Sequence, residues 1–252
     1  MQTILQLAFG AFGTILFILL AHKKIGEYPT PLPRSKNPRR ELFEAIIIWL
    51  IIFASISYVV LFGAESYPSI AIGGIKFSMH FFLVLLTPFV VEVVIHRRSA
   101  KELGFAFPIS WKPALALIGF GLFFGVFAFL FERPGPMGTK ALMLGILSPS
   151  FKEEWFYRAT LQSKLERALG QHKGWFYGGL LFGLAHIPTN FFGPLWAASG
   201  YSVTAALFRL LGQCAFGWLW GILYTKCRSL FPGVIGHYLS DFLPGILPYY
   251  VR

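Results

Sequence analysis

The sequence predicts an all-α, polytopic membrane protein of about eight transmembrane helices, and three observations support this fold class. Of the 252 residues, 56% are hydrophobic and only 13% are charged, whereas soluble domains average about 25% charged residues. The apolar residues form long runs separated by short polar loops. The positive residues gather in alternate loops, as the positive-inside rule requires. We therefore expect one transmembrane domain, residues 1–252, in contact with the lipid bilayer.

The apolar runs have the length that a membrane span needs, since a bilayer core about 30 Å thick takes about 20 apolar residues. The first run has no positive residue before it, so we interpret it as a retained helix rather than a signal peptide. Pro149 interrupts the fifth run, and the uncharged stretch after the sixth predicts a re-entrant or interfacial loop. The runs are 3–21, 42–63, 75–95, 113–131, 139–168, 174–189, 202–224 and 231–250.

The positive residues predict the orientation. An N-terminus outside the membrane puts 15 Lys and Arg residues on the inner side and 4 on the outer side, namely Lys76, Arg133, Lys140 and Arg252. Both termini then lie outside, in what we expect to be a prokaryotic cell membrane. Because topology accounts for the net charge of +11, we expect no nucleic acid partner.

Ionisable side chains inside the spans are the main functional signal. Each costs at least about 2.5–3.5 kcal/mol at the bilayer centre, so such groups are retained mostly for function. They gather in the second half of the chain, and one of them, Asp241, is the only aspartate in the protein. The set is Lys152, Glu153, Glu154, Arg158, His186, Arg209, His237 and Asp241.

The spacing of Glu153, Glu154 and Arg158 predicts different roles for the two glutamates. Glu154 and Arg158 are four residues apart and share a helix face. Glu153 points about 100° away, since a helix has 3.6 residues per turn, so it can face a cavity with a tunable carboxyl group. The plainer alternative is a capping box from Ser150 to Glu153 beside a buried Glu154–Arg158 ion pair.

Two histidine motifs follow. Phe182 lies one turn before His186, on a Gly-rich stretch that favours close helix approach, and His237 shares a helix face with Asp241. The alternatives are an ordinary interhelical hydrogen bond from His186 and a local His237–Asp241 pair. In the predicted topology His186 lies about 18 Å and Asp241 about 15 Å from the inner face. This common depth predicts a polar cavity in the inner half of the membrane.

The three motifs in this order resemble the CAAX protease and bacteriocin-processing family of intramembrane endopeptidases, also called CPBP or Abi proteins. The matching patterns are Glu153-Glu154-x-x-x-Arg158, Phe182-x-x-x-His186 and His237-x-x-x-Asp241. The resemblance covers about residues 140–245. It implies a conical cavity open toward the cytosol and a peptide or protein substrate.

The resemblance also implies roles for these residues. Glu153 and His186 would activate a water molecule, and His237 with Asp241 would stabilise the oxyanion. Glu154, Arg158 and Phe182 would support the site. An ionised aspartate cannot donate a hydrogen bond, so Asp241 would be protonated or would orient His237.

No cofactor is expected, with zinc as the mechanistic alternative. Two histidines and a carboxylate form a common zinc site, and Glu153, His186 and His237 would be its ligands. The sequence has no H-E-x-x-H motif and no serine in a nucleophile elbow.

The sequence therefore predicts an intramembrane endopeptidase acting by a Glu/His-activated water, in CAAX-type or leader-peptide processing. A non-catalytic membrane scaffold or immunity protein with the same fold is the first alternative. A proton-coupled carrier is the second, because intramembrane Glu, His and Asp chains also suit proton relays. No internal repeat supports a transporter.

Overall fold

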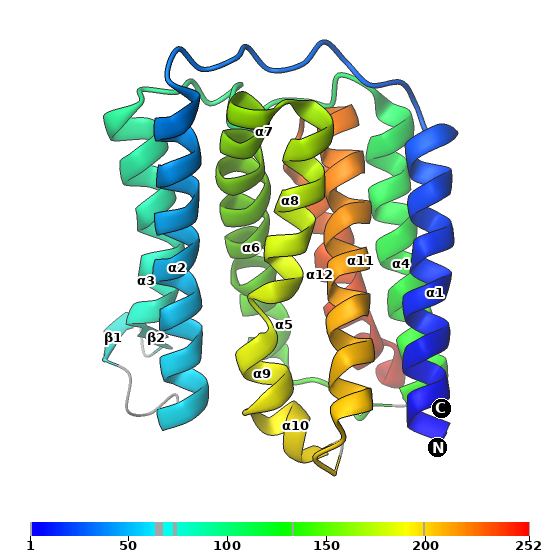
Figure 1. Cartoon of the computed structure of the whole chain (residues 1–252). Helices are drawn as coiled ribbons and strands as arrows, with labels where there is room; N and C mark the ends of the chain where they lie inside the picture. The colour runs from blue at the N-terminus through cyan, green and yellow to red at the C-terminus, as the bar shows by residue number, and fades with distance from the viewer. Residues whose placement is uncertain (1, 64–67, 73–74, 133, 199, 252) are drawn as a thin grey trace.

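A computed structural model describes residues 2–63, 68–72, 75–132, 134–198 and 200–251. Helices make up most of this part of the chain (Figure 1). The elements are α1 (Gln2–Lys23), α2 (Pro38–Phe62), β1 (Ser69–Ile72), β2 (Ile75–Ser78), α3 (Met79–Pro88), η2 (Phe89–Ile95), α4 (Trp111–Glu132), α5 (Thr139–Gly145), η3 (Ile146–Phe151), α6 (Lys152–Glu154), η4 (Trp155–Gln162), α7 (Ser163–Leu169), α8 (Gln171–Leu184), α9 (Ile187–Phe191), α10 (Pro194–Ala198), α11 (Val203–Cys227), α12 (Phe231–Ile246) and η5 (Leu247–Tyr249).

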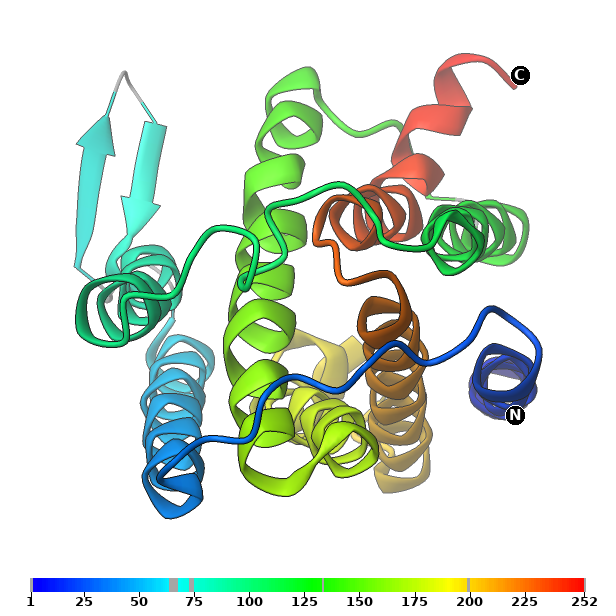
Figure 2. The same ribbon diagram turned by 90° about the horizontal axis from the view of Figure 1, so that it is seen from above.

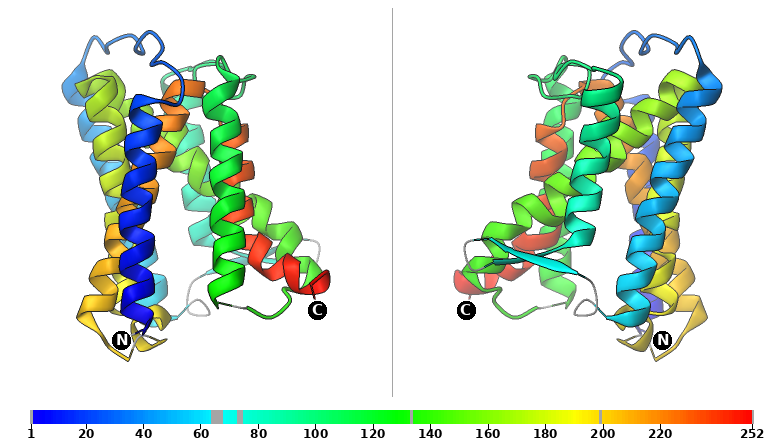
Figure 3. Two further views of the ribbon diagram at one scale, coloured as in Figure 1. Left: turned by 90° about the vertical axis from the view of Figure 1, so that its right-hand side faces the viewer. Right: turned by 90° about the vertical axis from the view of Figure 1, so that its left-hand side faces the viewer.

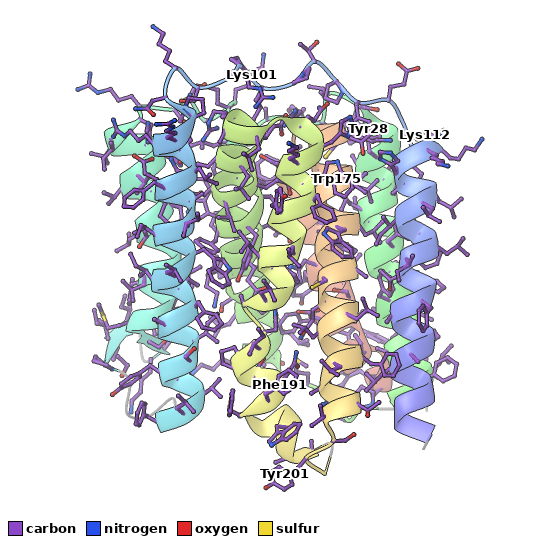
Figure 4. The ribbon with its side chains drawn as sticks, viewed as in Figure 1. Tyr28, Lys101, Lys112, Trp175, Phe191 and Tyr201 are labelled. Carbon is purple, nitrogen blue, oxygen red and sulfur yellow. The ribbon has the colours of Figure 1, made fainter. Side chains whose placement is uncertain are left out.

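The long helices run side by side as a bundle with two distinct ends (Figures 1 and 2). Both chain termini lie at one end (Figure 3). The exposed side chains of Lys101 and Lys112 lie at the other end, which we call the basic end (Figure 4). The linker from α1 to α2 crosses the bundle at the basic end (Figure 2).

The apolar helices identify an integral membrane protein. Three are long and apolar enough to cross a bilayer: Pro38–Phe62, Trp111–Phe131 and Val203–Cys227. Their outward faces carry large apolar side chains, such as Phe43 on α2, 65% exposed, and Leu115 on α4, 60% exposed. Lipid is the solvent that tolerates such a surface. The count of about eight spans remains a prediction. Of the residues used for the orientation, Arg133 and Arg252 lie outside the described part.

One local expectation was wrong. The run 75–95 does not begin as a helix, because Ile75–Ser78 is strand β2 and pairs antiparallel with β1. The run 231–250 is helical over most of its length, since α12 ends at Ile246 and the short 3-10 helix η5 follows. Strands β1 and β2 have only four residues each, and a hydropathy count over long windows averages such short elements away.

The predicted break at Pro149 is confirmed. Ser148 has extended backbone angles (φ −145°, ψ 118°) between helical segments. A kink at proline is expected because proline lacks an amide hydrogen and clashes with the preceding turn. The π-helical segments η3 and η4 flank α6, so the two glutamates lie in an irregular helix, of the kind common at functional sites.

Glycines bring the site-bearing helices together. A Cβ atom on Gly121 of α4 would overlap the backbone of Gly236 of α12. One on Gly179 of α8 would lie 2.6 Å from the backbone nitrogen of Trp218 of α11. The predicted close approach at the Gly-rich helix is thus present: α8 packs tightly against α11, as α12 does against α4.

Candidate active site

A cavity of about 750 Å³ lies inside the bundle, and all four residues predicted to be catalytic line it: Glu153, His186, His237 and Asp241. It is bounded by α1, α4, α6, the end of α8, α11 and α12. The remaining wall is largely apolar and includes Phe124, Phe182 and Phe216. A few convergent polar groups in an otherwise apolar pocket are typical of a binding or active site.

The two glutamates lie in different surroundings, as expected. Glu153 faces the cavity, while Glu154 is buried and its Oε2 lies 3.4 Å from Nε of Arg158. Arg158 also donates from Nη1 to the carbonyl of Gly217 at 3.1 Å, which ties η4 to α11. The capping-box alternative is wrong, because Oγ of the buried Ser150 has no hydrogen-bond partner among the described residues.

His237 is surrounded by carboxylates. Its Nδ1 lies 3.1 Å from Oε1 of Glu154, and its Nε2 lies 3.4 Å from Oδ2 of Asp241 and 3.9 Å from Oε2 of Glu153. Ionised carboxylates only accept hydrogen bonds. Both contacts of the ring are therefore satisfied when both of its nitrogens carry hydrogen, as in an imidazolium ion.

Asp241 has a second partner besides His237. Oγ of Ser240 lies 2.9 Å from Oδ1 of Asp241, and the same hydroxyl lies 2.8 Å from the backbone carbonyl of His237. The spacing of four residues correctly predicted the His237–Asp241 pair. It did not predict Glu154 as the partner of the other ring nitrogen.

His186 has its tautomer set by the backbone. Its Nδ1 lies 2.8 Å from the carbonyl oxygen of Phe182, and a carbonyl only accepts, so Nδ1 carries hydrogen in this contact. A neutral ring then has a lone pair on Nε2, available to the cavity that His186 lines. The helix α8 ends at Leu184, so His186 lies in the turn before α9, rather than inside the Gly-rich helix.

Phe182 connects the first two motifs. Its ring centroid lies 4.9 Å from that of His186, and the guanidinium carbon of Arg158 lies 5.3 Å from the same centroid. An arginine within about 6 Å of an aromatic centroid makes a cation–π interaction. Phe182 is buried and also contacts Tyr157 edge to face at 4.9 Å, so it fixes the wall behind His186.

The alternative zinc ligands do not converge. Among the residues that the structure describes, Glu153, His186 and His237 do not offer three ligand atoms within 4.8 Å of one another, whereas Glu41, Glu44 and His96 do. That second group already holds a cation, because Nζ of Lys164 lies 2.6 Å from Glu44 Oε2. The zinc alternative for Glu153, His186 and His237 stays a prediction.

Several site residues were missed by sequence reasoning. Gln213 and Ser240, which belong to no motif position, line the cavity, and Arg209 lines it as well. Asn190 is buried, and its Nδ2 lies 2.6 Å from Oε1 of Gln213. Asparagine and glutamine resemble ordinary loop and helix residues in sequence, so only their position at the cavity distinguishes them.

The first four apolar runs carry no motif, but helices from them form part of the cavity wall. The cavity wall includes Gly10, Ala11 and Thr14 of α1 and Phe124 and Phe127 of α4. Buried charges also occur in this half of the chain, which the sequence did not indicate. Glu92 is fully buried and contacts Lys164 and Arg167 of α7, at 2.9 Å and 3.0 Å.

The cavity lies in the half of the bundle away from the basic end. It is lined by the N-terminal halves of α1 and α11 and the C-terminal half of α4. These halves are remote from Lys101 and Lys112 (Figure 4). The cavity and the basic end therefore lie in opposite halves of the bundle.

The fold and the cavity together define a helical integral membrane protein with an acid–imidazole site inside the bundle. Residues 135–243 match the family model of type II CAAX prenyl endopeptidases described as Rce1-like. The match spans less than half of the chain and contains all three motifs, so the resemblance to the CAAX protease family is confirmed. Searches of curated proteins and of solved structures found no match.

Proposed function

We propose that this protein is an intramembrane endopeptidase that hydrolyses a peptide bond with a water molecule activated by Glu153 and His186. The observation that carries the proposal is the shared cavity of Glu153, His186, His237 and Asp241. The Rce1-like match supports protease activity in general. No observation in the described part of the chain favours a scaffold or a carrier over this function.

In the proposed reaction, Glu153 accepts one proton of a water molecule, whose second hydrogen Nε2 of His186 accepts as a hydrogen bond, and the water oxygen attacks the scissile carbonyl carbon. The tautomer of His186 supports this role, because its Nδ1 is engaged by the Phe182 carbonyl. The proton then passes to the leaving amine, and the carbon–nitrogen bond breaks. The products are a carboxylic acid and an amine, so no further reactant is needed.

His237 would stabilise the oxyanion. A ring that donates through Nδ1 to Glu154 and carries hydrogen on Nε2 presents positive charge to the cavity. Such preorganised charge is often the largest contribution to lowering a barrier of this kind. Asp241 would act as an ionised acceptor that orients His237, since Ser240 also donates to it. Glu154 and Arg158 would fix the helix, and the mechanism assigns no step to a metal.

We propose further that the basic end faces the cytosol and that the cavity extends toward the outer leaflet. The 15-to-4 distribution of positive residues supports this orientation. In this proposed orientation the cavity would open away from the cytosol, in contrast to what the family resemblance implies. A leader peptide or the terminus of a membrane protein is then a better substrate than a cytosolic CAAX terminus.

Peptide cleavage by the purified protein tests the enzymatic proposal. A quenched-fluorescence library of prenylated and unprenylated peptides would be offered to the wild type, Glu153→Ala and Glu27→Gln, with and without a chelator. Glu27 is an exposed carboxylate in the α1–α2 linker, so Glu27→Gln controls for the loss of one negative charge. We expect cleavage by the wild type and by Glu27→Gln, and none by Glu153→Ala.

Cleavage retained in Glu153→Ala would overturn the proposed role of Glu153. Loss of cleavage on adding the chelator would overturn the metal-free mechanism. A biological function that survives replacement of both Glu153 and His186 would favour the scaffold.

Labelling of single cysteines tests the orientation. Lys101 and the exposed Tyr201 lie at opposite ends of the bundle (Figure 4), and the two native cysteines, Cys214 and Cys227, are buried. In intact cells, a membrane-impermeant thiol reagent should label Tyr201→Cys and not Lys101→Cys. The reverse pattern would invert the topology and return the cavity to the cytosolic side.

A further inference from the structure

A second cavity, of about 330 Å³, lies at the basic end of the bundle. It is formed by the end of the α1–α2 linker, the first turn of α2, the segment after η2 and α7. Its lining is unusually rich in cationic side chains: Arg34, Lys36, Arg40, Arg98 and Arg167, together with His96 and a single acid, Glu41. It shares no residue with the candidate active site.

A largely buried ionic cluster, which we call the floor, contributes Glu41, Arg98 and Arg167 to the lining of this cavity, and its charges balance. Arg98, Lys164 and Arg167 pair with Glu41, Glu44 and Glu92. Three cations therefore meet three carboxylates. Buried charges must be paired in this way, because an unpaired one carries a large desolvation cost. The floor contributes no net charge, so the charge of the cavity comes from its rim.

The rim carries surplus positive charge. Arg34, Lys36 and Arg40 are exposed there, and Arg40 shares its charge with Glu44 at 2.8 Å. The 25-residue helix α2 also begins at this rim, capped by Asn37. The positive end of its dipole adds to the attraction for an anion.

The linker is held in place, so the rim exists before any ligand arrives. Nη1 of Arg34 donates to the carbonyl of Ala168 at 2.9 Å. The amide of Ser35 donates to the carbonyl of Arg167 at 3.2 Å. A preformed site binds more tightly than a mobile one, because less conformational freedom is lost on binding.

Lipid-facing side chains begin directly beside the cationic rim. On α2, Phe43 is 65% exposed, one turn beyond Arg40. On η2, Val94 and Ile95 are 57% and 54% exposed, immediately before His96. An anion bound at the rim would thus have hydrocarbon-compatible surface next to it. That combination is typical of a phospholipid whose headgroup lies in a basic pocket.

From this geometry we propose that the basic-end cavity binds the phosphate headgroup of an anionic glycerophospholipid, with the acyl chains along α2 and η2. The lipid is anchored by Arg34, Lys36 and Arg40, while the neutral floor positions the linker. The site joins α2, the segment after η2 and α7, so an occupied site stabilises the bundle. This proposal does not depend on the proposed protease activity.

Native mass spectrometry and thermal unfolding of the detergent-purified full chain test the proposal. Short-chain phosphatidylglycerol, phosphatidylcholine and inorganic phosphate would be added separately. The variants are Lys36→Gln and the triple change Arg34→Gln, Lys36→Gln and Arg40→Gln. Lys101→Gln with Lys112→Gln removes two exposed charges at the same end and is the matched control.

We expect phosphatidylglycerol to bind and to raise the unfolding temperature more than phosphatidylcholine does. Lys36→Gln should weaken this binding about fivefold, as expected for one basic residue near a lipid surface. The triple change should weaken it further, and the control should bind like the wild type. Because Lys36 is exposed, Lys36→Gln tests the site even if the triple variant fails to fold.

Two results would overturn the proposal. Equal loss of binding in the control would mean that lipid binding depends only on the overall positive charge of this end and not on the cavity. An equal effect of inorganic phosphate would identify a simple phosphate site in which the acyl chains play no part.

Discussion

Nδ1 of His237 lies 3.1 Å from Oε1 of Glu154, although 83 positions separate the two residues in the sequence. The other carboxylate oxygen of Glu154 faces Arg158. A buried chain Arg158–Glu154–His237 therefore joins the first sequence motif to the third. It leaves Nε2 of His237 directed toward Asp241 and Glu153 at the cavity. Of the two adjacent glutamates, Glu154 is therefore part of the buried chain and Glu153 faces the cavity.

Glu153→Gln should abolish most of the cleavage activity while leaving the fold intact. Glu153 lines the cavity and is partly exposed, with a side-chain exposure of 22%. An amide cannot act as a general base, and such a base is worth about 10²–10⁴ in rate. The measurement is kcat on a cleaved peptide, with the unfolding temperature as the control. Activity within a factor of two of the wild type would refute the assigned role.

Glu154→Gln should instead reduce stability. The change leaves Arg158, which is fully buried, without its carboxylate partner. It also replaces one of the two acceptor oxygens, which face His237 and Arg158, with an NH2 donor. Breaking a buried ion pair by removing one member costs about 3–5 kcal/mol. Thermal unfolding in detergent should show the loss, together with a lower yield of folded protein. A Glu154→Gln protein as stable as Glu153→Gln would contradict the buried chain described above.

Gln213→Leu should lower kcat more than it changes KM. Asn190 donates to Oε1 of Gln213, which leaves the side-chain NH2 group of Gln213 to the cavity. A donor aimed at developing negative charge acts mainly in the transition state. We expect a loss of about tenfold or more in kcat, by comparison with known oxyanion donors. An effect confined to KM would identify Gln213 as a substrate-binding residue only.

Lys226→Met should loosen the contact between α11 and the end of α1. The buried ammonium of Lys226 lies 2.8–3.2 Å from the carbonyls of Ala21, His22, Ile25 and Gly26. It satisfies acceptors that a helix end otherwise leaves without partners. The expected cost is about 2 kcal/mol or more.

Lys112→Met is the control for Lys226→Met, since Lys112 is exposed at the same end of the bundle. Unfolding temperatures that fall equally in both variants would show that the loss reflects a changed surface charge and not the bonds to α1.

Much of the candidate site could be predicted from local spacing. Glu154 and Arg158, like His237 and Asp241, are four residues apart, and one helical turn brings such pairs together regardless of the rest of the fold. The orientation of Glu153 away from Glu154 follows from the same geometry. By contrast, neither the contact of His237 with Glu154 nor the hydrogen bond between Asn190 and Gln213 has a local signal. These contacts arise only when α6, α9, α11 and α12 pack together.

The sequence by itself determined the helical membrane class, because a chain with so few charges needs an apolar solvent. It also determined the three motifs, and they agree with the Rce1-like match. The tertiary structure decided that Glu154 also contacts Nδ1 of His237. It also decided that the cavity lies away from the basic end, and that Glu92 meets Lys164 and Arg167. The physical reason is that these relations depend on packing between helices, which hydropathy and spacing along one helix do not encode.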